Sequence, residues 1–180
     1  MTGSATPAER HWFFVIRADD RPGSAASIAT TFSGRGIQME SFYGFGDSRG
    51  IERETGAVIG ITFLAFPHRM ASVRRVLERL EPVRWVQVYD YEADPRLVKV
   101  VLLRVAMQAD RALAIAGEGG DVTAQVLDQA AASTGLLLTG RPSEVDAALD
   151  RLRREAQVTI SSGTLLPPEE GGVPASIHPG

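Results

Sequence analysis

The sequence predicts an α+β protein made of two tandem ferredoxin-like (βαββαβ) domains. Strand-like runs alternate with segments of helical periodicity in the order strand–helix–strand–strand–helix–strand. The same order follows a second time, after a polar junction at residues 92–95. A chain of 180 residues is long enough for two small domains with cores of their own.

Within the first half, the expected strands are rich in β-branched and aromatic residues, and the expected helices repeat apolar side chains at helical spacing. Pro22 takes the first helical position, where its fixed φ suits a helix start. Gly34 and Gly36 end that helix. The predicted strands cover 11–17, 37–45, 57–66 and 83–91, and the predicted helices cover 22–33 and 69–80.

The second half repeats this order with a weaker first helix, and Ser143 is the expected N-cap of its last helix. Its predicted strands cover 97–106, 122–127, 135–139 and 158–160, and its predicted helices cover 108–117 and 143–154. We therefore expect four segments along the chain. They are a flexible N-terminal arm (1–10), a first domain (11–92), a second domain (96–166) and a Pro/Gly-rich disordered tail (167–180).

The composition is that of a globular protein without nucleic-acid or membrane features. Hydrophobic residues make up 44% and charged residues 23%, and the net charge of −3 gives no basic footprint for nucleic acid. No apolar run approaches the ~18–20 residues of a membrane helix, and the first ten residues lack the apolar core of a signal peptide. The absence of cysteine removes disulfides and thiol chemistry. We expect a cytoplasmic protein.

The sequence contains no constellation of residues with catalytic spacing. His11, His68 and His178 are too scattered to form a metal cluster. The pair Asp19–Asp20 has no nucleophile, ligand set or cofactor motif beside it. We therefore expect no catalytic residue, no metal and no cofactor.

The stretch ADDRPGSA joins the first strand to the first helix. The first N–H groups of a helix have no partner within it, and the helix dipole favours an anion there. Those groups belong to Gly23, Ser24 and Ala25, and they could hold the carboxylate of a free amino acid. Asp20 could then hold the ammonium group, and Gln38 could add an amide contact from nearby. The alternative is plain turn chemistry, in which Asp20 caps the helix and Gln38 faces solvent.

The D-R-P-G turn, the helix of small and apolar residues and the following RGIQMESF resemble an ACT domain. More narrowly, the chain resembles the regulatory (small) subunit of acetolactate synthase, in which an ACT domain precedes a second ferredoxin-like domain. The segment RGIQMES is similar to the RGxNIxS segment of that family. The resemblance covers about residues 12–165 and is clearer in the first half.

This resemblance implies a non-catalytic regulatory subunit of a transferase, working as a homodimer. A branched-chain amino acid, typically valine, would bind between two ACT domains. The partner would be the thiamine-diphosphate-dependent catalytic large subunit of branched-chain amino-acid biosynthesis, under allosteric control. Carried over by position, the effector contacts fall on Asp20, Gly23 and Gln38. The family has asparagine where this chain has Asp20 and Gln38.

Two other functions fit the same residues. The chain could be a free-standing ACT amino-acid sensor that regulates another enzyme or pathway, as the two departures from the family pattern suggest. It could also be a dimerisation module without a ligand. The response to free amino acids distinguishes these three functions.

Overall fold

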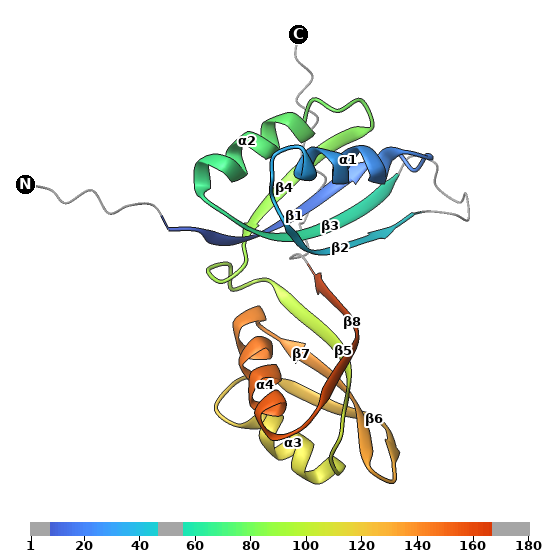
Figure 1. The fold of residues 1–180 in the computed structure, drawn as a ribbon, viewed down its shortest axis with the longest axis vertical. Coiled ribbons are helices and arrows are strands. Elements are labelled where there is room, and N and C mark those ends of the chain that lie inside the picture. Colours follow the sequence, from blue (N-terminus) through green and yellow to red (C-terminus); the bar gives the residue numbers. More distant parts are fainter. Residues whose placement is uncertain (1–7, 47–55, 167–180) are drawn as a thin grey trace, which may run out of the picture. The chain divides into compact units, whose positions relative to one another are not determined.

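The computed structural model describes residues 8–46 and 56–166, which form two compact units, Met1–Pro95 and Arg96–Gly180 (Figure 1). Most of the predicted arm, the predicted tail and His178 lie outside the described residues. Each unit has the βαββαβ order and an antiparallel four-stranded sheet with both helices on one face. The predicted α+β class with two ferredoxin-like domains is therefore confirmed.

The first unit has the strand order β2-β3-β1-β4, so β2 and β4 are its edges. Alternate residues of the central strand β1 point into the core, because side chains on a strand alternate between its two faces. Phe14 packs edge-on against Phe63 and Phe32, with ring centroids 4.8 and 6.1 Å away. The elements are β1 (Arg10–Ala18), α1 (Ser24–Ser33), β2 (Met39–Phe45), β3 (Ala57–Ala65), α2 (Pro67–Leu77) and β4 (Val83–Asp90).

The second unit has the equivalent strand order, β6-β7-β5-β8, and a separate aliphatic core. Leu136, Leu138 and Leu152 are fully buried there between the sheet and its helices. The elements are β5 (Val98–Val105), α3 (Ala109–Gly117), β6 (Thr123–Ala130), β7 (Ser133–Gly140), α4 (Pro142–Glu155) and β8 (Val158–Leu166).

All four helices start one or two residues from the predicted positions, and at α1 and α4 the difference changes the role of a named residue. Helix α1 begins at Ser24, because Gly23 takes the N-cap position with a left-handed φ of 93° and leaves Pro22 outside the helix. Helix α4 begins at Pro142, whose fixed φ suits the first helical position. Ser143 therefore lies inside the helix and is not its N-cap.

Candidate functional site

The turn between β1 and α1 is held from the segment that leads into β4. The Asp19 N–H donates to the Pro82 carbonyl at 2.7 Å, and the Asp19 carboxylate accepts from Arg84 Nε at 2.8 Å. Arg21 pairs with Glu81 at the surface, and this hydrogen bond and the Glu81 charge raise the pKa of Arg21. The turn is thus fixed on one side and open on the side of the helix start.

Helix α1 starts without a side-chain cap. Asp20 does not cap it, because Gly23 occupies the N-cap position. The Ser24 N–H donates to the Arg21 carbonyl at 3.2 Å, so it belongs to the turn. Within the described residues, the N–H groups of Ala25 and Ala26 have no acceptor, and both residues are exposed. Of the predicted donors, only the Ser24 N–H is therefore taken; those of Gly23 and Ala25 make no hydrogen bond within the described residues, and that of Ala26 joins them.

The side chain of Ser24 is the unsatisfied polar group of this site. Ser24 is 5% exposed, and its Oγ has no hydrogen-bond partner among the described residues. A buried hydroxyl without a partner costs about 1–3 kcal/mol, and native structures retain few such groups. Sequence reasoning placed Ser24 in the site through its N–H, whereas the structure leaves its hydroxyl buried and unpartnered in the first turn of the same helix.

Asp20 reaches from the turn to the end of β2. It is exposed, and a Cβ built on Gly46 would lie 2.6 Å from Asp20 Oδ2. A side chain at position 46 would require this exposed carboxylate to move aside. Asp20 thus adds a negative charge next to the open helix start, at the place where β2 leaves the sheet.

Gln38 lies at the opposite end of the sheet, so the predicted contact near the turn of its own chain is wrong. Helix α1 carries the chain back along the sheet, and β2 then runs parallel to β1, with β3 between them. The start of β2 therefore aligns with Trp12, whereas its end aligns with Arg17. The Gln38 side chain is exposed, and its Nε2 donates to the Met39 carbonyl at 3.1 Å.

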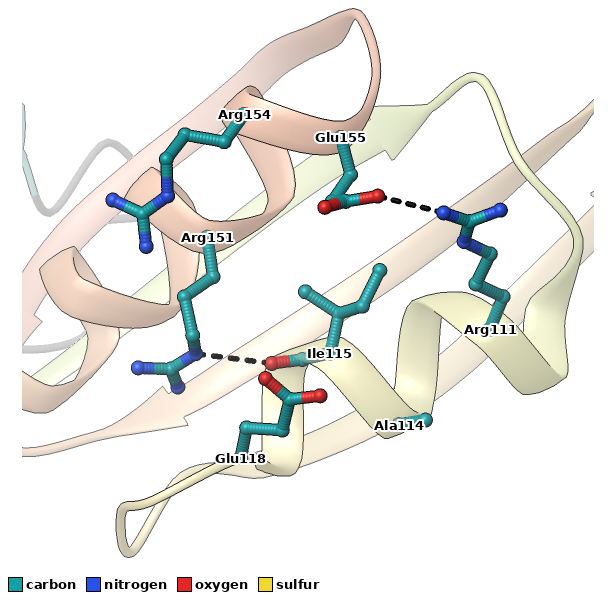
Figure 2. A pocket seen from close by; sticks show the side chains of 7 residues that line it. All are labelled: Arg111, Ala114, Ile115, Glu118, Arg151, Arg154 and Glu155. Carbon is teal, nitrogen blue, oxygen red and sulfur yellow. Dashed lines mark hydrogen bonds and ion pairs between the residues drawn. The ribbon is translucent and has the colours of Figure 1, made fainter.

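The second unit has a hollow of about 420 Å³ between α3 and α4 (Figure 2). Arg151 donates from Nε and from a terminal nitrogen to the Ile115 and Ala116 carbonyls, both at 3.1 Å. Arg111 pairs with Glu155 at 2.6 Å. These arginines satisfy the carbonyl end of α3 and the carboxylate of α4, so we assign the hollow a structural role. Its lining residues are Arg111, Ala114, Ile115, Glu118, Arg151, Arg154 and Glu155.

His11 and His68 take part in local packing. His11 stacks on Tyr91, and its Nε2 lies against the Glu40 carboxylate, whereas His68 stacks on Phe66. In residues 8–46 and 56–166, no three His, Cys, Asp or Glu side chains are grouped so that they could hold a metal ion. No helix of that part is long and apolar enough to cross a membrane.

Comparison with known proteins gives a match in structure alone. No family model and no curated protein matches the sequence. The acetolactate synthase small subunit from Thermotoga maritima superposes with a TM-score of 0.64 at 14% identity, over 87% of this chain and 96% of that one. The ligand-free regulatory subunit of aspartate kinase from Thermus thermophilus gives a TM-score of 0.41 at 16% identity, over 83% of this chain and 97% of that one. The fold of this chain is therefore the one predicted from its sequence, two tandem ferredoxin-like domains, and the acetolactate synthase small subunit from Thermotoga maritima shares it.

Proposed function

We propose that this chain is a non-catalytic regulatory subunit of the acetolactate synthase type that binds a free amino acid between two ACT domains. The observation that carries the proposal is the open start of α1, where the N–H groups of the exposed Ala25 and Ala26 have no acceptor and the buried Ser24 hydroxyl of the same turn has no partner. Donors of this kind at a helix N-terminus suit a carboxylate. The fold shared with the acetolactate synthase small subunit supports the same role.

A homodimer paired through β2 would complete this site. Strand β2 is a sheet edge with exposed apolar side chains, Phe42 at 40% and Phe45 at 65% exposure. Two such edges can pair antiparallel about a two-fold axis. With the axis at Phe42, the middle of the strand, Gln38 of one copy stands opposite Gly46 of the other. That glycine is the residue against which Asp20 lies.

Such a dimer brings together Gln38 and Gly46, which lie about 26 Å apart along one chain at ~3.3 Å per residue. The carboxylate of the amino acid accepts hydrogen bonds from the Ala25 and Ala26 N–H groups and from the Ser24 hydroxyl. Asp20 holds its ammonium group, and Gln38 of the second copy supplies an amide contact. Gly23 gives the turn its left-handed conformation and leaves the approach open, since nothing lies within 4 Å of a Cβ built there.

Regulation follows if the amino acid binds one assembly state more tightly than another. A ligand that bridges two copies stabilises their paired arrangement, and a coupling of about 1–3 kcal/mol is typical of allosteric effectors. The target would be a thiamine-diphosphate-dependent catalytic large subunit in the cytoplasm, and valine would be its feedback effector.

A second candidate function is a free-standing amino-acid sensor for another enzyme. The exposed charge of Asp20 at the site favours this candidate, because the acetolactate synthase family has a neutral amide at that position. A cationic or polar amino acid could use the carboxylate better than valine could.

The proposal is tested by thermal-shift measurements with each of the twenty free amino acids, followed by copurification and rate measurements with the large subunit from the same organism. We expect a saturable response to a branched-chain amino acid and a changed rate of the synthase. A response to a polar amino acid without an effect on the synthase would favour the sensor. No response to any amino acid would exclude both functions.

A further inference from the structure

Helix α1 ends in a left-handed glycine turn that leads directly to Gln38. Gly36 has a φ of 59°, and its N–H donates to the Ser33 carbonyl at 3.0 Å. The Ile37 N–H donates to the Phe32 carbonyl at 3.1 Å. This pair of bonds is the Schellman arrangement, which satisfies carbonyls of the last helical turn.

The carbonyls of Arg35 and Gly36 lie beyond this arrangement, and Arg69 binds both of them. Arg69 is the third residue of α2, and one of its terminal nitrogens donates to the Arg35 carbonyl at 2.5 Å. The same nitrogen makes a longer contact of 3.5 Å with the Gly36 carbonyl. A side chain of the second helix therefore holds the two residues that set the direction in which the chain leaves α1.

A second contact holds the chain on the other side of Gln38. Glu40 lies at the register shift between Met39 and Ser41, and its carboxylate lies against His11 Nε2 of β1. Gln38 is exposed between these two attachments. The chain is thus contacted on both sides of Gln38, whose exposed side chain donates only to the neighbouring Met39 carbonyl among the described residues.

We propose that Arg69 is a positioning residue for effector binding, acting through Gln38. The inference rests on the proposed function. By fixing the turn at Gly36, Arg69 sets the place at which Gln38 reaches the Asp20 turn of the second copy. In this proposal Arg69 acts through the turn, because one of its terminal nitrogens binds the carbonyls of its own chain.

A double-mutant cycle on the full chain tests this inference. Arg69→Gln and Gln38→Ala should each raise the Kd for the amino acid that shifts the wild-type melting temperature most, by about tenfold, the factor expected for one lost hydrogen bond. The double variant should bind no more weakly than either single variant, because both act on one contact. Arg69→Lys keeps a donor and should restore part of the affinity.

Arg75→Gln is the matched control. Arg75 lies on the same helix, but its Nε donates at 3.3 Å to Ala71 of that helix, so its loss should leave the Kd unchanged. Hydrogen exchange gives a readout without ligand. The Ile37 N–H should exchange faster in Arg69→Gln and at the wild-type rate in Arg75→Gln.

The outcomes separate the two proposals. A wild-type chain that binds an amino acid, with Arg69→Gln binding it equally well, would overturn the positioning role and leave the proposed function standing. Additive losses in the double variant would also overturn it. A wild-type chain that binds none of the twenty amino acids would overturn the proposed function, and the inference with it.

Discussion

The two units share one topology but differ at the turn that joins the first strand to the first helix. In the first unit this turn spans residues 19–23 and ends in a glycine with a φ of 93°. In the second unit it spans only residues 106–108, and Gln108 is the N-cap. Neither helix start has a side-chain cap, so the two turns differ in their length and in the left-handed glycine of the first.

The turn at residues 106–108 of the second unit makes hydrogen bonds with the hairpin of β6 and β7. Gln108 Nε2 donates to the Ala131 carbonyl at 2.9 Å, and Gln129 donates to Gln108 Oε1 at 2.8 Å. The fully buried Thr134 donates from Oγ1 to the Met107 carbonyl at 2.8 Å. The same topology therefore carries two turns with different side-chain contacts, and the candidate site is argued for the first turn alone.

The two units share one contact between their two helices. Each uses an arginine of its second helix to bind the carbonyls at the end of its first helix, Arg69 in the first unit and Arg151 in the second (Figure 2). Only in the first unit does the chain run from those carbonyls directly into an exposed edge strand with a candidate contact. The same capping interaction can therefore serve stability in one unit and a site in the other.

The largest predicted effect tests whether the two cores are independent. Phe63→Ala removes a fully buried ring that packs on Phe14 and Phe32, and it should lower the free energy of unfolding of the first unit by about 3–5 kcal/mol. Both tryptophans of the chain, Trp12 and Trp85, lie in the first unit, so tryptophan fluorescence during urea unfolding follows that unit.

Leu136→Ala is the counterpart in the second core, where it removes a fully buried side chain. It should lower the urea concentration at which the second unit unfolds, as followed by far-ultraviolet circular dichroism. The midpoint of the tryptophan fluorescence transition should stay unchanged. An equal shift of the tryptophan transition in both variants would mean that the chain unfolds as one cooperative unit.

A smaller effect on stability is expected from replacing one glycine by alanine in each unit. The two substitutions should act in opposite directions because the backbone conformations of the two glycines differ. A Cβ on Gly23 meets nothing within 4 Å, but the φ of 93° strains any L residue, so Gly23→Ala should lower the free energy of unfolding by about 1–2 kcal/mol. Gly117 also has open space around it but has no positive φ. Gly117→Ala should therefore stabilise its unit by about 0.4–1 kcal/mol. Urea unfolding measures both changes in the free energy of unfolding. If the two substitutions changed it in the same direction, this contrast would be contradicted.

The order of strands and helices was predictable because it depends on local patterns. β-branched and aromatic runs mark the strands, and apolar spacing marks the helices, so the fold class followed from the sequence. Helix starts were less predictable, because a Pro-Gly pair fits both a helix start at Pro22 and a turn in which Gly23 adopts a positive φ. Similarly, Pro142 and Ser143 are both good first-turn residues.

The site was predictable only in part, because it depends on long-range arrangement. The sequence alone groups Asp20, Gly23 and Ser24, because they are close neighbours along the chain. The burial of the Ser24 hydroxyl depends on packing, which no local pattern reports. The place of Gln38 depends on β2 running parallel to β1, a property of the strand order.

Removal of a buried hydroxyl should change the free energy of unfolding in opposite directions at Ser24 and at Thr134. Ser24→Ala removes a buried hydroxyl without a partner and should raise the free energy of unfolding of the first unit by about 1 kcal/mol, while weakening amino-acid binding. Thr134→Val leaves the Met107 carbonyl without its donor and should lower the stability of the second unit by about 1 kcal/mol. Urea unfolding with calorimetric binding measurements checks both. A destabilised Ser24→Ala variant would show that this hydroxyl has a partner in the free protein.

The smallest effect on stability concerns two exposed carboxylates, each lying over a glycine. Asp20 lies over Gly46 and Asp128 lies over Gly135, but Asp128 also pairs with Arg104 at 2.7 Å. Asp20→Asn and Asp128→Asn should each change the free energy of unfolding by less than about 0.5 kcal/mol, because both side chains are exposed.

Binding should separate these two variants where stability does not. If Asp20 holds the ammonium group of the amino acid, Asp20→Asn removes an ionic contact and should raise the Kd about tenfold in low salt. Added salt weakens binding by the wild-type chain and by Asp128→Asn, but it should have little further effect on Asp20→Asn, because the screened charge is already absent. Titration calorimetry at two salt concentrations measures this difference. An unchanged salt dependence in Asp20→Asn would mean that the ammonium group binds elsewhere, and the open turn would then recognise its ligand through the helix start alone.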